Sequence, residues 1–346
     1  MNQPHIQSLA TAVPEHRYTQ MEIYDGFLAP YLDNRRARMV FEAAQIDTRH
    51  SVITDPAWLA ANPSTEVRND LYLAEAQRLG RRVIQRALDR AGLGPGDIDE
   101  FVVVSCTGFD SPGLDVLLAG QLGMRPTLRR TAIIGMGCYG FFPGLQRALG
   151  GLALHPDSQV LILNLELTTL HFQHDRSLRN VIASAIFADG ASAVVLGAGN
   201  GGQARIIDTL TYCDYQTLDH MAFHVTDRGF KMNMSTKIPD VLRDNTPRLV
   251  EQLVRPHGLT IHDIRFWGVH PGGAKILDYL EQALNLEPDA LRFSRRVLRE
   301  KGNMSSPTVI FVLEAIQQEG KPQAGDYGLL MAFGPGLTTE MCLLQW

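Results

Sequence analysis

Cys138 stands in the stretch IIGMGCYGFF (133–142), where an apolar, β-like run meets a turn flanked by glycines. A helix is predicted directly after this turn, over residues 138–154. The N-terminus of a helix carries free backbone N–H groups and a partial positive charge, and both favour a thiolate over a thiol. Cys138 is therefore a candidate nucleophile. The alternative for an isolated cysteine is a small, buried apolar residue.

His270 in GVHPGG and Asn303 in GNMSSP are the two residues that could act with Cys138. A histidine within reach would stabilise the thiolate as its imidazolium partner. His and Asn can also both donate hydrogen bonds to one developing oxyanion. Cysteine proteases use the same three residue types, but their Asn orients the His, and their local signatures do not occur in this sequence.

An internal repeat would bring these residues together. Similar segments begin at Gly92 and Gly258, share the spacing GL…DI and continue into a strand, with a constant offset of 166 residues. Nearly the same offset relates Cys138 to Asn303, and each is followed by a turn with a proline and then a helix. Two halves of similar architecture would place both residues at equivalent helix starts, with His270 at the end of the repeated strand.

Helical and strand-like segments alternate along the chain, which is typical of an α/β protein. Residues 71–93 have apolar side chains at helical spacing, and residues 100–108 form a short β-branched run. Residues 159–167 and 190–197 are predicted to be buried strands because their apolar residues are consecutive.

The glycine-rich stretch 197–203 follows a strand but does not open a helix. This arrangement favours a linker over a phosphate-binding loop. The sequence therefore predicts two halves, residues 1–200 carrying the nucleophilic cysteine and residues 201–346 carrying the His and the Asn.

Composition limits the classes of partner. The chain has 346 residues, is 45% hydrophobic and has a formal net charge of -5, with no long Lys/Arg run for a nucleic acid or an anionic membrane. No run of eighteen apolar residues and no signal-peptide pattern occurs, so a cytoplasmic protein is predicted. The four cysteines are widely spaced and form no CxxC pair, so free thiols are expected.

Four ordered motifs resemble the chalcone synthase family, the type III polyketide synthases, and in particular its bacterial members. They are GMGCYG (135–140), GVHPGG (268–273), GNMSSP (302–307) and AFGPGLTTE (332–340). The resemblance extends over nearly the whole chain. It implies a thiolase-like fold, an αβαβα five-layer sandwich of two pseudo-equivalent halves, and a homodimer.

The resemblance also implies a reaction. Cys138 would take the acyl group of a CoA thioester and carry the growing chain, while His270 and Asn303 would hold the thioester oxygen of malonyl-CoA as CO2 leaves. The substrates would be malonyl-CoA and an acyl-CoA starter, with no metal and no organic cofactor. Cyclisation would give a pyrone, a resorcinol or a small aromatic polyketide.

Two alternatives remain open. A ketoacyl synthase of the same fold would perform a single condensation, but its His motif typically reads HQAN where this chain has HPGG. An inactive homologue would only bind acyl-CoA or a protein partner. The intact set of Cys138, His270 and Asn303 argues against the inactive homologue.

The resemblance assigns a substrate cavity. Phe187 matches a phenylalanine that gates the CoA tunnel, and Met232 stands where the family has its second gate phenylalanine. Cys106 replaces a threonine of the plant enzymes, and Phe223 replaces a glycine, which reduces the cavity and favours an aliphatic starter or malonyl-CoA itself. The other implied substrate-binding residues are His171, Ser305, Gly334 and Pro335.

Two further sets of residues give less specific functional signals. The basic residues Arg35, Arg36, Arg38 and Arg49 lie about where the family binds CoA, although a solvated helix face is the alternative for the first three. The segment HFQHD (171–175) has two histidines at i, i+3 and an aspartate, which are residue types that bind metal ions. No third ligand is suggested nearby, so no metal is predicted.

Overall fold

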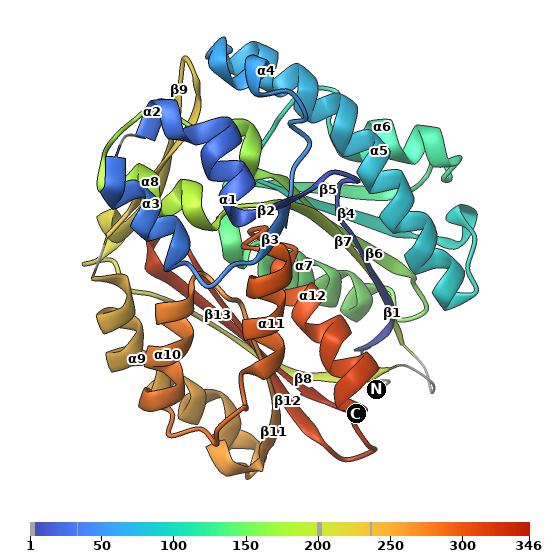
Figure 1. Ribbon diagram of the computed structural model, residues 1–346. Coiled ribbons are helices and arrows are strands. Elements are labelled where there is room, and N and C mark those ends of the chain that lie inside the picture. The colour runs from blue at the N-terminus through green and yellow to red at the C-terminus, as the bar shows by residue number, and fades with distance from the viewer. Residues whose placement is uncertain (1–3, 33, 199–202, 236) are drawn as a thin grey trace.

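A nine-stranded sheet runs through the whole molecule in the order β11-β12-β13-β8-β1-β7-β6-β4-β5 (Figure 1). The computed structural model describes residues 4–32, 34–198, 203–235 and 237–346. The strands of the sheet are β1 (Pro4–Ala12), β4 (Glu100–Ser105), β5 (Arg129–Ile134), β6 (Val160–Leu167), β7 (Asp189–Ala198), β8 (Ala204–Cys213), β11 (Ile264–Val269), β12 (Tyr327–Gly334) and β13 (Thr338–Gln345).

The sheet consists of two halves with the same strand order. In the first half β4 pairs with β6 in parallel, and β6–β7 and β7–β1 are antiparallel. In the second half β11 pairs with β12 in parallel, and β12–β13 and β13–β8 are antiparallel. The halves meet where β1 pairs with β8, and β5 extends the first half at its edge. The repeat found in the sequence is confirmed, since its two strands are β4 and β11.

Helices cover both outer faces and fill the space between the halves. The larger helices are α5 (Thr65–Ala91), α6 (Leu114–Leu122), α7 (Phe141–Leu154), α8 (Leu178–Ile186), α9 (Ile238–Val254), α10 (Ala274–Ala283), α11 (Arg292–Lys301) and α12 (Thr308–Ala315). Shorter helices near the N-terminus are α1 (Gln20–Ile23), α2 (Ala29–Leu32), α3 (Asn34–Glu42) and α4 (Pro56–Ala60).

Three apolar cores account for the predicted five layers. One packs α5 and α6 on the outer face of the first half, and a second packs α9 and α10 on the outer face of the second half. In the third core, Phe142 and Leu145 of α7 and Ile310 of α12 contact strands of both halves. Figure 1 shows α7 and α12 between the two outer layers. The thiolase-like αβαβα architecture is thus confirmed.

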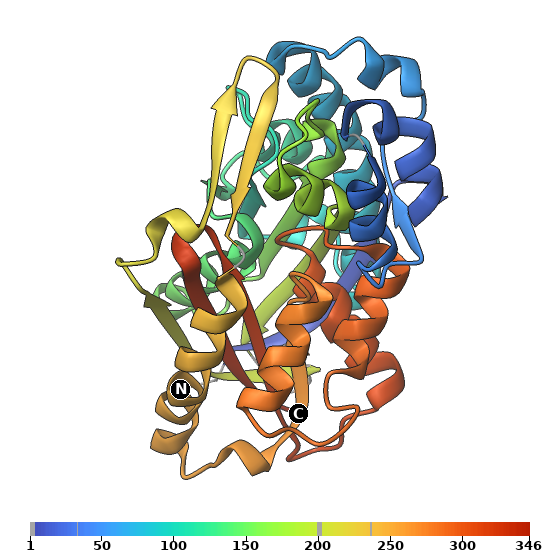
Figure 2. The same ribbon diagram turned by 60° about the vertical axis from the view of Figure 1, so that its left-hand side comes forward.

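Two small two-stranded sheets lie outside the main sheet. β2 (Arg17–Thr19) pairs with β3 (Thr48–His50), and β9 (Met221–Thr226) pairs with β10 (Gly229–Met234). The β9–β10 hairpin extends away from the sheet in Figure 2. Its turn needs a positive φ, which Gly229 supplies at 94°. The sequence analysis did not predict this hairpin.

The structure corrects the predicted helix starts. Cys138 lies in a single 3-10 turn (Gly137–Tyr139), and α7 begins only at Phe141. Asn303 likewise precedes α12, which begins at Thr308. Both residues therefore occupy turns before helices of the central layer.

The predicted linker and division of the chain are only partly covered by the structure. Residues 199–202 of the linker 197–203, and with them the boundary between 1–200 and 201–346, lie outside the described residues. The division at that point stays a prediction. Among the described residues, no helix is both long enough and apolar enough to cross a membrane.

The central layer gives a first prediction. Phe142 is fully buried in α7, so Phe142→Ala should lower the free energy of unfolding by about 3 to 5 kcal/mol through lost burial and a cavity. Leu154 ends the same helix with 77% of its side chain exposed, and Leu154→Ala should change it by less than about 0.5 kcal/mol. Urea denaturation of both variants measures the difference, and equal effects would contradict the central placement of α7.

Candidate active site

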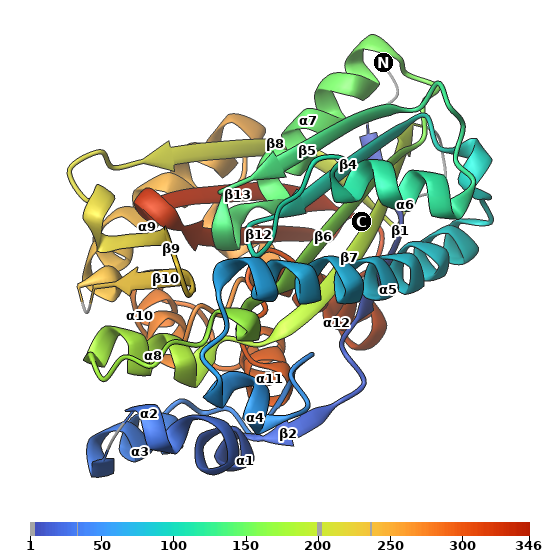
Figure 3. The same ribbon diagram turned by 90° about the horizontal axis from the view of Figure 1, so that it is seen from above.

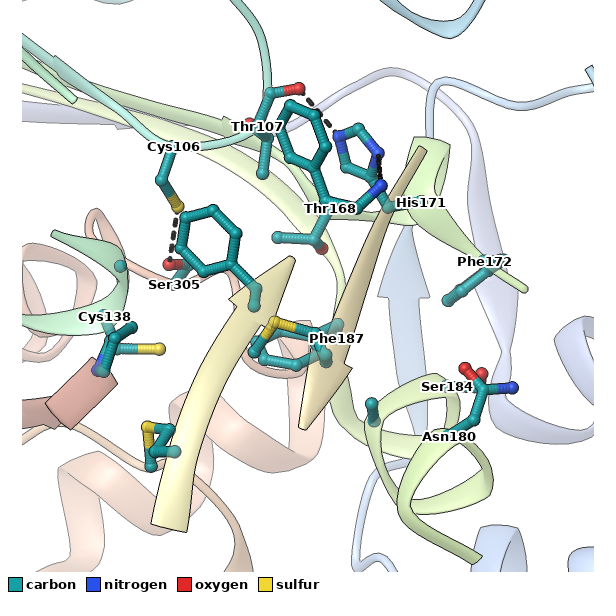
Figure 4. A pocket seen from close by; sticks show the side chains of 17 residues that line it. Cys106, Thr107, Cys138, Thr168, His171, Phe172, Asn180, Ser184, Phe187 and Ser305 are labelled. Carbon is teal, nitrogen blue, oxygen red and sulfur yellow. Dashed lines mark hydrogen bonds between the residues drawn. The ribbon is translucent and has the colours of Figure 1, made fainter. Parts of the chain in front are cut away.

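A cavity lies where the β9–β10 hairpin, α8 and the Cys138 turn approach one another (Figure 4). It encloses about 630 Å³ of empty space, counting its opening. The predicted site residues that line it are Cys106, Cys138, His171, Phe187, Phe223, Met232, Ser305 and Pro335. Lining residues that the sequence analysis missed are Thr107, Gly137, Thr168, Phe172, Asn180, Ala183, Ser184, Met221 and Phe230.

Glycines allow the Cys138 turn to pack against the end of β12. Gly137 has a φ of 66°, and a Cβ there would lie 2.6 Å from Cδ of Pro335. A Cβ on Gly334 would lie 3.3 Å from the backbone nitrogen of Cys138 and 2.5 Å from the Tyr139 ring. Gly334 thus acts behind the cavity as a spacer, whereas Pro335 lines it. The turn of one half and the strand end of the other fix the position of the thiol together.

Asn303 is buried beside Cys138 in a fixed orientation. Its Oδ1 accepts a hydrogen bond from the backbone N–H of Ser305 at 2.8 Å, so its Nδ2 is the donor to Cys138. Ser305, whose φ of 60° is unusual for a residue with a side chain, also hydrogen-bonds Cys138. Hydrogen bonding from Ser305 and Asn303 acts to lower the pKa of Cys138, so both side chains lie close to the thiol.

Burial dominates the protonation of Cys138. It raises the pKa of the thiol to about 12, although hydrogen bonds with Ser305 and Asn303 act in the opposite direction. The site therefore favours the neutral thiol over the expected resting thiolate, because the thiol is buried and α7 begins only after it. A proton acceptor is needed when Cys138 attacks.

His270 is a buried imidazole at the end of β11. Its backbone N–H donates to Met331 O in β12 at 2.8 Å, a few residues before Gly334. Within the described part of the chain neither ring nitrogen has a hydrogen-bond partner, and burial lowers the pKa of His270 to about 3. The ring is thus neutral, with one nitrogen able to accept a proton and the other able to donate. Buried polar atoms without partners are uncommon, which marks this imidazole as a candidate functional group.

His171 is held in one tautomer by the backbone. Its Nδ1 accepts from the N–H of Phe230 at 3.1 Å, so its Nε2 carries the proton and donates to Thr107 O at 2.8 Å (Figure 4). Burial lowers its pKa to about 4, so the ring is neutral. Both nitrogens are therefore occupied and unsuited to a metal ion. Among the residues the structure describes, no cluster of three or more His, Cys, Asp and Glu could hold one.

The hairpin supplies an aromatic wall. The rings of His171 and Phe230 stack with centroids 4.2 Å apart, and Phe223 follows Phe230 at 6.0 Å. Phe223 and Met232 face each other directly across the two strands. Phe187, at the end of α8, forms another part of the lining. The signal that could have revealed Phe230 is the pair of short β-like runs around the turn TDRG.

Glu166 is a buried carboxylate that the sequence analysis missed. It accepts hydrogen bonds from Cys106 N at 2.9 Å, Thr107 Oγ1 at 2.8 Å and Ser306 Oγ at 2.8 Å. Burial nevertheless raises its pKa to about 7. The Sγ of Cys106 also points to Glu166, at 3.3 Å, and burial and this carboxylate raise the pKa of that thiol. Cys106 is therefore a protonated thiol in the cavity wall. The signal in the sequence was a glutamate in a strand that is otherwise apolar except for Asn164.

The four arginines fall into two groups. Arg35, Arg36 and Arg38 are exposed on α3, which packs against α8 (Figure 3), and Arg38 is ion-paired with Asp25 and Glu42. Arg49 is fully buried, so the prediction that it binds CoA at a tunnel mouth is wrong. Its guanidinium instead donates to backbone carbonyl oxygens behind the cavity.

Comparisons with known proteins agree with this geometry. Residues 3–200 match the N-terminal domain of chalcone and stilbene synthases, and residues 213–346 match the C-terminal domain. The chain is 35% identical to 1,3,6,8-tetrahydroxynaphthalene synthase of Streptomyces peucetius subsp. caesius, over 99% of this chain and 93% of the relative. It is 30% identical to 3,5-dihydroxyphenylacetyl-CoA synthase of Streptomyces toyocaensis, over 99% and 90%.

Comparison with solved structures agrees with these sequence matches. PKS-I of the brown alga Ectocarpus siliculosus superposes with a TM-score of 0.94 at 28% identity, over 100% of this chain and 98% of that chain. The bacterial type III polyketide synthase 1,3,6,8-tetrahydroxynaphthalene synthase of Streptomyces coelicolor superposes with a TM-score of 0.92 at 32% identity, over 99% of both chains. With both domains matched and relatives of this identity along its whole length, the chain belongs to the chalcone and stilbene synthase family.

Proposed function

We propose that this chain is a type III polyketide synthase that extends an acyl group on Cys138 with malonyl-CoA and releases a small aromatic polyketide, pyrone or resorcinol. The observation that carries the proposal is the oriented Asn303 amide on the buried Cys138 thiol, in a cavity lined mainly by apolar side chains. The names of the relatives, a tetrahydroxynaphthalene synthase and a dihydroxyphenylacetyl-CoA synthase, support the product class.

Loading begins with the sulfur of Cys138. As it attacks the carbonyl carbon of a starter acyl-CoA, the thiol proton passes to a ring nitrogen of the neutral His270. A new C–S bond forms, and the tetrahedral intermediate collapses with cleavage of the C–S bond to CoA. The leaving CoA thiolate takes up the proton, so His270 returns to its neutral form.

Extension requires a carbanion, which decarboxylation supplies. The bond between the malonyl methylene carbon and its carboxylate breaks, CO2 leaves, and the electron pair forms a thioester enolate. Asn303 Nδ2 and the N–H of His270 donate to the enolate oxygen. The enolate carbon attacks the Cys138 thioester and frees the cysteine, and the lengthened chain on CoA reloads for the next round. The substrates supply all atoms, so the proposal includes no metal or organic cofactor.

The exposed arginines of α3 are the proposed contacts for the phosphates of CoA. Arg35, Arg36 and Arg38 lie on one helix that packs on α8, and α8 contributes Asn180 and Ser184 to the cavity. A cytoplasmic location stays a prediction from composition.

Direct assay tests the function. The protein is incubated with radiolabelled malonyl-CoA, alone and with a panel of acyl-CoA starters, and the products are identified by mass. Iterated products support the proposal, a single condensation indicates a ketoacyl synthase, and no turnover with intact folding indicates an inactive homologue. Cys138→Ser should abolish all products.

Asn303→Ala separates loading from decarboxylation. The variant loses one enolate donor but keeps Cys138 and His270, so acylation of Cys138 should persist while malonyl-CoA decarboxylation falls by ~10²-fold or more. Intact-protein mass and CO2 release measure the two steps. Asn245→Ala, which removes an amide that bonds Val241 O on α9, is the control. If Asn303→Ala decarboxylates malonyl-CoA at the parent rate, Asn303 has only a structural role.

Phe223→Gly tests the cavity wall. Removing the ring opens space beside Phe230 and should shift products towards longer chains or larger starters. Glycine weakens a strand by about 0.5 to 1 kcal/mol, so Val225→Gly, at a 70% exposed position on the same strand, controls for that effect. An unchanged product profile, or efficient chalcone formation from p-coumaroyl-CoA by the parent enzyme, would refute the proposed cavity limit.

The proposed homodimer has a candidate surface at the sheet edge. Among the described strands β5 pairs only with β4; its last residue, Ile134, is 54% exposed, and Phe109, which follows β4, is 63% exposed. An open apolar edge strand is a ready template for pairing with a second copy. Ile134→Lys should therefore shift the mass measured by light scattering towards the monomer, whereas Leu154→Lys at an exposed apolar site elsewhere should not. A dimer that survives Ile134→Lys at all concentrations would exclude this edge.

A further inference from the structure

Arg49 is a buried cation in the wall behind the cavity. It is fully buried, and its Nη1 donates to the carbonyl oxygens of Ser184 and Phe187, each at 2.7 Å. Both of these residues line the cavity, at the end of α8. Because taking a charge out of water is costly, a guanidinium at this place needs a reason beyond filling space.

The same segment is bonded to Asn303 on its other side. Asn303 N–H donates to Ile186 O at 2.8 Å, and Asn303 O accepts from Ala188 N–H at 2.9 Å, which makes a parallel bridge between Phe187 and Asn303. Within the segment 184–188, the carbonyl oxygens of Ser184 and Phe187 thus accept from Arg49, and that of Ile186 accepts from Asn303. A shift of this segment would move the gate phenylalanine and the proposed enolate donor together.

The aliphatic stem of Arg49 also touches the residue before Asn303. Gly302 has a φ of 74°, and a Cβ there would lie 3.0 Å from both Cγ and Cδ of Arg49. A side chain at position 302 would thus have to displace Arg49. Arg49 contacts the backbone of the Asn303 loop directly, in addition to holding the segment that Asn303 bridges.

A buried carboxylate, Asp189, belongs to the same support as Arg49. Asp189 is fully buried, accepts from Val52 N–H and Thr169 N–H, each at 2.8 Å, and attracts the Arg49 guanidinium electrostatically. Thr169 lies in the turn that carries the lining residues Thr168 and His171. Arg49 and Asp189 therefore join β3, the turn after β6 and the end of α8 into one support.

We propose that Arg49 is a positioning residue for the condensation reaction: it acts through Phe187 and Asn303, whose backbones it holds in register, and does not bind CoA. The proposal rests on the proposed function only for its kinetic readout. Its physical content is that loss of the guanidinium displaces Asn303 from Cys138 while leaving the nucleophile in place.

Arg49→Lys is the test, with Arg68→Lys as the matched control. Arg68 is also fully buried and also donates to backbone carbonyl oxygens, those of Leu170 and the lining residue Phe172, but these lie outside the segment 184–188 that Asn303 bridges. Lysine keeps the charge and loses the forked donors. Arg49→Gln is made in parallel, so that a folding failure of one variant does not remove the test.

Arg49→Lys should lower kcat for malonyl-CoA decarboxylation about tenfold or more, with KM within about twofold and Cys138 acylation retained, because a small misplacement of a donor costs rate and not binding. Arg68→Lys should leave the ratio of decarboxylation to acylation at the parent value, even if its melting temperature falls equally. A raised KM at unchanged kcat in Arg49→Lys would indicate that Arg49 binds CoA. An equal ratio of decarboxylation to acylation in Arg49→Lys and Arg68→Lys would indicate that Arg49 has a purely structural role. Either result overturns the proposal.

A second readout does not depend on polyketide synthesis. Asn303 lowers the pKa of Cys138 through its hydrogen bond, so displacement of Asn303 should slow alkylation of Cys138 by iodoacetamide. Arg49→Lys should slow it several-fold relative to Arg68→Lys at one pH. If the parent enzyme makes no product but this difference holds, the proposed function fails and the positioning role stands. Equal alkylation rates overturn the positioning role, whatever the activity.

Discussion

The site depends on the close approach of two backbones, one from each half of the chain. The Cys138 turn and the end of β12 pass so near one another that Gly137 and Gly334 have no room for a side chain. This contact places the thiol of the first half at the border of the second half, which supplies His270 and Asn303. Since α7 and α12 belong to one apolar core that includes strands of both halves, the approach is fixed by the central core and not by surface loops.

Burial then sets the chemistry. Cys138, His270 and Glu166 are all enclosed, so in each case the neutral form is favoured: the pKa of the thiol and of the carboxyl rises, and that of the imidazole falls. The site therefore favours a neutral thiol and a neutral imidazole over a resting thiolate–imidazolium pair. Among the residues the structure describes, both ring nitrogens of His270 lack a hydrogen-bond partner, and a donor in a dry environment is worth more than in water.

Much of this could be predicted from the sequence, and the failures have physical reasons. The repeat gave the two-halved sheet and the pairing of Cys138 with Asn303, because apolar runs and turn residues are local signals. Arg49 was misassigned because a basic residue looks the same in sequence whether it meets solvent or two buried carbonyl groups. Glu166 was missed for the converse reason, since only the fold shows that Cys106, Thr107 and Ser306 converge on it.

The β9–β10 hairpin shows how such a site can vary its product without disturbing its catalytic centre. In the described part of the chain the hairpin pairs with no strand of the main sheet, yet it carries Phe223, Phe230 and Met232 into the cavity. One side chain on it can change the space for the growing chain at little cost to the cores. His171 links this adjustable wall to the rigid part, because its ring bonds Thr107 after β4 with one nitrogen and Phe230 with the other. The cavity is thus bounded on one side by the Cys138 turn, which the central layer supports, and on the other by a hairpin outside the main sheet.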